Sequence, residues 1–303
     1  MRDSRSPRLW AVVGATGTGK TALSLELAAQ LAKQGTRVEI VNEDAMQVYR
    51  GMDIGTAKLP VAERQAVPHH LFDVLDITAE ATVAWYQPEA RHTIHEIASR
   101  GNDAILVGGS GLYVSSVIYD FQFPPRDEQL RAMLELRLER EGSDSLLMQL
   151  ETLDPAAAAS IDRQNPRRIV RALEIAMLGG SAVTQLPDSP GLWWPDTTVI
   201  GTRIERSVLV ERLDRRVELM WQAGLIDEVR GLLHDGLERG KTASQAIGYQ
   251  QAIAQLRGEL TEAEAIASTQ LATRRYARRQ VSWFKRYAEV QWCTTSGEEH
   301  EAV

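Results

Sequence analysis

Residues 14–21 have the sequence Gly-Ala-Thr-Gly-Thr-Gly-Lys-Thr, which matches the pattern G-x-x-x-x-G-K-[ST] at every fixed position. The apolar run 9–13 before this motif predicts a buried strand, and leucines four residues apart over 21–33 predict a helix after it. A loop in this setting turns its backbone N–H groups toward phosphate oxygens, and the helix adds the positive end of its dipole. The motif therefore predicts an α/β fold that binds the phosphate groups of a ligand.

The side chains of the motif have distinct chemical tasks. The glycines let the backbone curl, and the lysine neutralises phosphate charge. The predicted phosphate-binding residues are Gly14, Thr16, Gly17, Thr18, Gly19, Lys20 and Thr21. Because a hydroxyl at the end of such a loop is a suitable ligand for Mg²⁺, we also predict a magnesium ion held by Thr21.

The first 110 residues alternate between apolar runs and helical patterns, which predicts a parallel sheet covered by helices. The predicted strands are 9–13, 38–41 and 104–107, and the predicted helices are 21–33 and 82–100. Pro88 is expected to bend or split the second helix. An acid directly after the second strand, Glu43 or Asp44, would lie at the carboxyl edge of the sheet, where ligands bind in open α/β folds.

The rest of the chain is predicted to be mostly helical. Residues 127–178 favour several short helices, including one that starts at Asp154-Pro155, a strand is expected at 198–204, and helices follow from 208 to about 284. Prolines border the first of these regions. The predicted organisation is an α/β core formed by 8–121 and 197–293, a helical insertion at 122–196, and flexible tails at 1–7 and 294–303.

Composition limits the classes of function. The net charge is −7, so nucleic-acid binding requires a local basic patch, and residues 271–287 supply one with six basic and no acidic side chains. Cys293 is the single cysteine, which excludes an intramolecular disulfide and a cysteine-based zinc site. The apolar runs are too short to span a membrane, and the N-terminal segment lacks the apolar stretch of a signal peptide. We therefore expect a cytoplasmic protein that does not bind membranes.

Several further segments resemble one known family. They are DAMQVYRGMDIGTAK at 44–58, PHHL at 68–71, GGSGLY at 108–113, NPRRIVRALE at 165–174, ERLDRRVELM at 211–220, AIGYQQ at 246–251 and RRYARRQVSWFKR at 274–286. Together with the 14–21 motif they follow the order found in bacterial tRNA dimethylallyltransferases, the IPP transferase family, over nearly the whole chain. The segment DIGTAK and the GGSGLY turn are much more specific to this family than the glycine-rich motif.

The resemblance implies a P-loop kinase-like core with a helical insertion. It implies transfer of a dimethylallyl group from dimethylallyl diphosphate to N6 of adenosine 37, 3′-adjacent to the anticodon, with Mg²⁺ as cofactor and the tRNA anticodon stem-loop as partner. ATP is not a substrate in this reaction. We expect the protein to be a monomer.

The resemblance also assigns roles to residues. Asp44 matches the catalytic aspartate and Ser110 a threonine near the reacting centre, while Arg212 and Arg216 lie four apart on one helix face and are expected to contact the diphosphate. Expected tRNA contacts are Asp44, Ala45, Met46, Gln47, Ser110, Arg131, Arg167, Arg168, Arg171, Arg274, Arg275, Arg278 and Arg279. Ala15, Ala45 and Ser110 stand where many members of the family have proline, serine and threonine. Trp283 and Phe284 are either core residues or platforms for base stacking.

Two other functions use the same phosphate-binding loop. A small-molecule or nucleotide kinase would bind ATP and use the Arg212/Arg216 pair as part of a lid. A non-catalytic regulator would bind RNA without transferring a group. The DIGTAK segment and the basic C-terminal helix favour the transferase over both.

Overall fold

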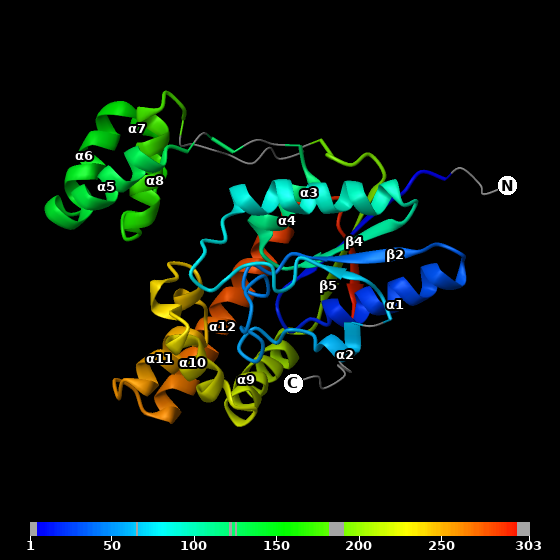
Figure 1. Ribbon diagram of the computed structural model, residues 1–303. Coiled ribbons are helices and arrows are strands. Elements are labelled where there is room, and N and C mark those ends of the chain that lie inside the picture. The colour runs from blue at the N-terminus through cyan, green and yellow to red at the C-terminus, as the bar shows by residue number, and fades with distance from the viewer. Residues whose placement is uncertain (1–4, 65, 121–122, 125, 182–190, 296–303) are drawn as a thin grey trace. The chain divides into compact units, whose positions relative to one another are not determined.

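The structure is a computed structural model that describes residues 5–64, 66–120, 123–124, 126–181 and 191–295 (Figure 1). The chain divides into two compact units. The larger unit includes the chain up to Asp120 and from Gly191 onward, and the smaller unit runs from Phe121 to Pro190.

A six-stranded sheet forms the centre of the larger unit, and all five pairings between neighbouring strands are parallel. The strands, in their order across the sheet, are β3 (His69–His70), β2 (Val38–Asn42), β4 (Asp103–Gly108), β1 (Leu9–Gly14), β5 (Thr197–Arg203) and β6 (Gln291–Thr294). The predicted α/β class with a parallel sheet is confirmed. Because β1, β2 and β4 are parallel neighbours or next neighbours, the segments that leave their carboxyl ends meet at one edge of the sheet.

Helices cover both faces of this sheet. Figure 1 shows α3 (Val83–Ser99) and α4 (Gly111–Ile118) on one face and α1 (Lys20–Lys33) on the other. The remaining helical elements of this unit are α2 (Val61–Arg64), α9 (Arg206–Gln222), α10 (Leu225–His234), η1 (Leu237–Arg239), η2 (Ala243–Gln245), α11 (Tyr249–Leu256) and α12 (Glu262–Phe284). A second apolar core joins α9, α10 and α11 to the segment after β2 through the buried residues Val48, Tyr49, Trp221, Leu225 and Tyr249.

The smaller unit is a group of four helices, α5 (Glu128–Glu141), α6 (Ser143–Leu153), α7 (Pro155–Ser160) and α8 (Pro166–Met177). Its core contains the fully buried residues Leu134, Leu146, Leu150, Ile169 and Leu173. Asp127, Asp154 and Asn165 each cap a helix start by accepting a hydrogen bond from a backbone N–H of the first turn. The predicted short helices and the Asp154-Pro155 start are confirmed.

Some boundaries differ from the sequence predictions. Residues 191–196, predicted as part of the insertion, lie in the larger unit, where the backbone N–H of Trp193 donates to the Ile118 carbonyl (2.9 Å). Helix α3 continues through Pro88, so the split that was predicted as one of two outcomes does not occur. Thr294, predicted as part of a tail, pairs in β6 because its neighbour strand β5 is long enough to receive it. Residues 296–303 of that tail and residues 1–4 lie outside the described residues.

Candidate active site

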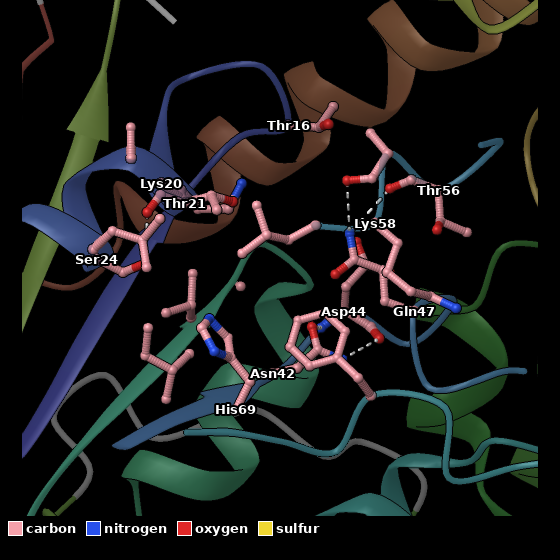
Figure 2. A pocket seen from close by; sticks show the side chains of 18 of the residues that line it. Thr16, Lys20, Thr21, Ser24, Asn42, Asp44, Gln47, Thr56, Lys58 and His69 are labelled. Carbon is pink, nitrogen blue, oxygen red and sulfur yellow. Dashed lines mark hydrogen bonds between the residues drawn. The ribbon is translucent and has the colours of Figure 1, made fainter. Parts of the chain in front are cut away.

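A cavity of about 190 Å³ opens at the carboxyl edge of the sheet. It is lined by part of the 14–21 loop, by the end of β2 and the residues after it, by residues 56–59, and by α9 (Figure 2). The lining residues predicted from the sequence are Thr16, Gly17, Gly19, Lys20, Thr21, Asp44, Gln47 and Arg216. Elements far apart in the chain therefore place five of the seven predicted phosphate-binding residues of the 14–21 motif, all but Gly14 and Thr18, and the predicted catalytic acid around one space.

The 14–21 loop has the backbone conformation that its glycines permit. Gly17 and Gly19 have φ angles of +80° and +84°, in the left-handed region, and a Cβ on Gly17 would lie 2.8 Å from the Leu213 side chain. Helix α1 starts directly after Gly19, and its first turn contains no acidic residue. No carboxylate of the first turn therefore neutralises the positive end of the helix dipole, which faces the cavity. This loop is shaped to bind an anion at its backbone N–H groups.

The loop is fixed by contacts with distant parts of the chain. The backbone N–H of Thr16 donates to Gln280 Oε1 of α12 (2.9 Å), and Thr18 Oγ1 lies 2.6 Å from Thr202 Oγ1 of β5. The Thr295 hydroxyl donates to the Thr18 carbonyl (3.1 Å). Thr18 is buried behind the loop with its hydroxyl already bonded, so only its backbone remains for the predicted phosphate contact.

Lys20 and Thr21 lie on the cavity wall, as Figure 2 shows. Lys20 Nζ donates to the Ala15 carbonyl (2.9 Å), which holds the ammonium group beside the loop. Thr21 is exposed. No cluster of three or more His, Cys, Asp or Glu side chains suited to a metal ion occurs among the described residues. A magnesium ion that keeps several waters and binds one hydroxyl together with ligand phosphates fits this donor set.

Asp44 is held by its own neighbours in the sequence. Its backbone N–H donates to Asn42 Oδ1 (3.0 Å), and its Oδ1 accepts from the backbone N–H of Met46 (2.8 Å). Burial raises the pKa of Asp44 above its usual value, against the opposing effects of the Met46 N–H and the positive charge of Lys20. The carboxylate is therefore a better base than an exposed aspartate, and it faces the cavity that the 14–21 loop also lines.

Ser110, the N-cap residue of α4, lies between two other elements. Its hydroxyl shares a hydrogen bond of 3.0 Å with the hydroxyl of Tyr276 on α12, and its backbone N–H donates to Glu43 Oε2 (3.2 Å). Burial and the charge of Asp44 raise the pKa of Tyr276, which keeps the phenol neutral. Sequence reasoning did not identify Tyr276, because its contact with Ser110 joins residues that are 166 positions apart.

The segment after Asp44 is shaped by internal hydrogen bonds. Gln47 Nε2 donates to the Thr56 carbonyl (3.0 Å), so the amide that was expected to recognise a base also holds the loop that contains Thr56. Met46 is half-buried and packs against the second apolar core, and Ala45 is buried.

The DIGTAK segment is folded around Glu228 of α10. The Glu228 carboxylate accepts from the backbone N–H groups of Asp53, Ile54 and Gly55 at 3.1, 2.7 and 3.3 Å. Three consecutive N–H groups form an anion-binding arrangement, but a side chain of the protein fills it here. Sequence reasoning did not identify Glu228, because it lies in an ordinary helical pattern far along the chain from the DIGTAK segment.

The two arginines of α9 are placed differently. Arg216 lines the cavity, and its guanidinium approaches the Thr16 hydroxyl at 3.5 Å. Arg212, one turn earlier, is half-buried and is not among the lining residues of this cavity. Of the predicted pair, the structure thus brings Arg216 to the 14–21 loop.

The basic side chains of α12 fall into two groups. Arg274 is half-buried, and its Nη1 donates to both carboxylate oxygens of Asp214 of α9, at 2.6 and 2.8 Å. Arg275, Arg278 and Arg279 are exposed. Phe284 is buried, and the Trp283 ring packs so closely on Gly111 that a Cβ there would lie 2.1 Å from it. The structure supports the core alternative for Trp283 and Phe284.

The predicted RNA-contacting arginines of the smaller unit also differ among themselves. Arg171 and Arg131 approach the fully buried Glu174 at 2.9 and 3.5 Å, so both help to neutralise a buried charge. Arg167 and Arg168 are exposed in the first turn of α8.

The adjacent histidines are engaged within the fold. His69 lines the cavity, its Nδ1 lies 2.7 Å from the Val67 carbonyl, and burial lowers its pKa, which favours the neutral ring. His70 Nε2 lies 2.6 Å from Glu39 Oε2. Both histidines form the short strand β3, so they are not turn residues.

A parallel sheet with a glycine-rich loop and an acid at one edge places the protein among α/β proteins whose ligand cavity lies at the carboxyl ends of the strands. Comparison with known proteins identifies the family. The family model described as IPP transferase matches residues 47–287, and the chain belongs to this family.

Relatives and solved structures agree with this membership. The chain is 57% identical over 280 residues to a tRNA dimethylallyltransferase of Clavibacter sepedonicus, covering 92% of this chain and 91% of that protein. The crystal structure of a tRNA isopentenylpyrophosphate transferase from Bacillus halodurans matches with a TM-score of 0.69 and 41% identity, covering 97% and 92% of the two chains. A eukaryotic dimethylallyltransferase acting on tRNA matches with a TM-score of 0.76 and 26% identity, covering 95% and 74%.

No helix among the described residues has both the length and the apolar character needed to cross a membrane.

Proposed function

We propose that the protein transfers a dimethylallyl group from dimethylallyl diphosphate to N6 of adenosine 37, the nucleotide 3′-adjacent to the anticodon of tRNA. The products are N6-(dimethylallyl)adenosine and diphosphate. The observation that carries this proposal is that Asp44 and the 14–21 loop line one cavity, so a base for the amine and donors for a diphosphate face the same space. Relatives named tRNA dimethylallyltransferase support it over a kinase.

The acceptor amine requires a base. The lone pair of an exocyclic adenine amine is conjugated into the ring, so N6 becomes a good nucleophile only as its proton is removed. In the proposed reaction the adenine leaves its stack and N6 approaches Asp44, whose raised pKa suits proton transfer. The new bond forms between N6 and C1 of the dimethylallyl group, and the proton passes to the Asp44 carboxylate.

The leaving group requires positive charge and N–H donors. As N6 bonds to C1, the C1–O bond breaks and its electron pair leaves with the diphosphate. The N–H groups of the 14–21 loop, the Lys20 ammonium and the Arg216 guanidinium surround the region where this charge develops. Mg²⁺, bound to Thr21 and the phosphates, would supply further neutralisation of the leaving group.

Exposed basic residues are proposed to bind the tRNA backbone. Arg275, Arg278 and Arg279 on α12 and Arg167 and Arg168 on α8 are accessible to phosphates. We assign Arg274, Arg131 and Arg171 a supporting role, because each is paired with an acid of the protein. We propose that the protein acts as a monomer in the cytoplasm, where tRNA is found.

The test is incubation of the protein with unmodified tRNA and either labelled dimethylallyl diphosphate or labelled ATP. We expect label to enter tRNA only from dimethylallyl diphosphate, at the adenosine adjacent to the anticodon. Phosphoryl transfer from ATP to any metabolite, without tRNA prenylation, would establish the kinase instead. RNA binding with no transfer from either donor would establish the regulator.

A further inference from the structure

Strand β2 and the residue after it carry two buried glutamates in opposite surroundings. The Glu39 carboxylate accepts hydrogen bonds from Arg100 (2.9 and 3.1 Å) and Asn102 (2.7 Å), and His70 lies 2.6 Å away. Burial would raise the pKa of Glu39, but these partners outweigh it and lower the pKa to about 2. Glu39 is therefore ionised.

Glu43 is fully buried and has little to stabilise a charge. Its Oε2 accepts from the backbone N–H of Ser110 (3.2 Å), while its Oε1 is buried without a hydrogen-bond partner among the described residues. A Cβ on Gly108 would lie 1.8 Å from Oε2, so the glycine provides the space for the carboxyl group. An ionised carboxylate that is buried away from solvent, with one of its oxygens unpaired, is far more costly than a protonated one.

The groups that face Glu43 from the neighbouring elements do not supply the missing partner. Lys20 acts on it through its positive charge, while Lys20 Nζ donates to the Ala15 carbonyl, and Asp44 adds a like charge. The hydroxyls of Tyr86 of α3 and Tyr113 of α4 donate to the carbonyls of Asn42 (2.7 Å) and Ala81 (3.1 Å).

The hydroxyl of Tyr276 of α12 does not supply the missing partner of Glu43 either, because it forms a hydrogen bond with the Ser110 hydroxyl. Burial and the charge of Asp44 raise the pKa of Glu43 well above its usual range, against the Ser110 N–H, Lys20 and the Gly109 N–H.

We propose that Glu43, as a neutral carboxyl group, is a positioning residue that fixes the Ser110 turn against the strand end that bears Asp44. Glu43 and Asp44 are consecutive, so the hydrogen bond between Glu43 and the Ser110 N–H sets where the Ser110 hydroxyl lies relative to the catalytic base. The neutral form also avoids a second negative charge near the place of the leaving diphosphate. This inference rests on the proposed function of Asp44 and Ser110.

The test compares E43A, E43Q and the matched control E39Q with the wild type in single-turnover prenyl transfer, with diphosphate binding measured in the same preparations. We expect E43A to lose about 10²-fold in the chemical step, the scale of a misplaced reacting group, with diphosphate binding retained. E43Q should restore most of that loss, because its amide oxygen accepts from Ser110 as a neutral carboxyl does. E39Q should keep the wild-type chemical rate.

A second measurement is independent of activity. Isotope-edited infrared difference spectra between the wild type and E43Q should show the carbonyl band of a protonated carboxyl group at neutral pH. The proposal is overturned if that band is absent, if E43Q loses as much rate as E43A, or if E43A reacts at the wild-type rate. A wild type that prenylates no tRNA would overturn the proposed function instead. If E43A does not fold, the single-turnover rate of E43Q and the infrared spectrum still test the proposal.

Discussion

Hydrogen bonds to Asn42 and to the backbone N–H of Met46 orient Asp44. An asparagine at this position keeps an oxygen for the Met46 N–H, so D44N preserves the shape of the site and removes only the charge and the basicity. We expect D44N to lower the rate of the chemical step by roughly 10²–10⁴-fold, the usual contribution of a general base. Diphosphate and tRNA binding should change far less.

Single-turnover prenyl transfer, measured beside equilibrium binding of both substrates, checks this expectation. The wild-type rate should rise with pH as Asp44 loses its proton, with a midpoint above the ordinary 3.8 because the pKa is raised. D44N should lack that rise. D76N, a change at an exposed surface ion pair with Arg50, is the control that should behave as wild type. A near-normal rate in D44N would remove Asp44 from the mechanism.

The lowered pKa of Glu39 leads to a prediction about the stability of the fold and not about the transfer reaction. Its pKa is lowered from 4.5 to about 2, so its ionised form stabilises the fold above pH 4.5, and this contribution is lost as the pH falls toward 2. We expect E39Q to lower the free energy of unfolding by about 1.5–3 kcal/mol at pH 7, the value of hydrogen bonds to a charged group. Urea unfolding of both proteins from pH 7 to pH 3 measures this. A difference that stays constant over the range would contradict the assigned ionisation.

Helix α12 serves both the site and the predicted RNA surface. Arg275, Arg278 and Arg279 are exposed, whereas Arg274 is bound to Asp214. We expect the triple variant R275A/R278A/R279A to weaken tRNA binding and to flatten its dependence on salt, by about 0.7–0.9 in the logarithmic slope for each phosphate that is no longer neutralised. Filter-binding or fluorescence titrations at several salt concentrations provide the slopes.

R274A is the matched comparison on the same helix. Because its guanidinium already neutralises Asp214, its removal should lower stability and leave the salt slope close to the wild-type value. If R274A flattens the slope as much as the triple variant, then the ion pair opens when RNA binds. If the folded triple variant keeps the wild-type slope, the exposed arginines of α12 do not contact phosphates.

Much of this arrangement was predictable, and the exceptions have a common cause. The strand and helix on either side of the 14–21 loop follow from local apolar patterns, as does the position of Asp44 after β2. Two-residue β3 and four-residue β6 are too short to leave such a pattern. Tyr276 and Glu228 were missed because their roles depend on contacts made across long stretches of sequence. Local patterns also do not show that Arg274 is already paired.

The two units of the molecule have separate apolar cores, and the lining residues of the cavity all belong to the larger one. Leu150 is fully buried in the core of the smaller unit. We expect L150A to cost the smaller unit about 2–5 kcal/mol, the usual penalty for truncating a buried leucine. Diphosphate binding should remain at the wild-type level, while tRNA binding weakens.

Hydrogen exchange followed by mass spectrometry locates the effect. Faster exchange should be confined to α5, α6, α7 and α8, with the sheet protected as in the wild type. L106A, which truncates a fully buried leucine of β4, is the matched control and should loosen the sheet and reduce diphosphate binding. Loss of diphosphate binding in L150A would show that the two units do not act separately in this respect.

The contact between Thr295 and the Thr18 carbonyl has a consequence for protein synthesis. Thr16 and Thr18 leave the ribosome 264 and 277 residues before Gln280 and Thr295, the residues that hold the loop through these contacts. The nascent chain therefore carries the loop without these contacts while all the residues in between are synthesised. A ribosome that stops before codon 280 leaves the whole 14–21 motif in its product, yet that product lacks Gln280 and Thr295, two of the residues that hold the motif in its binding form.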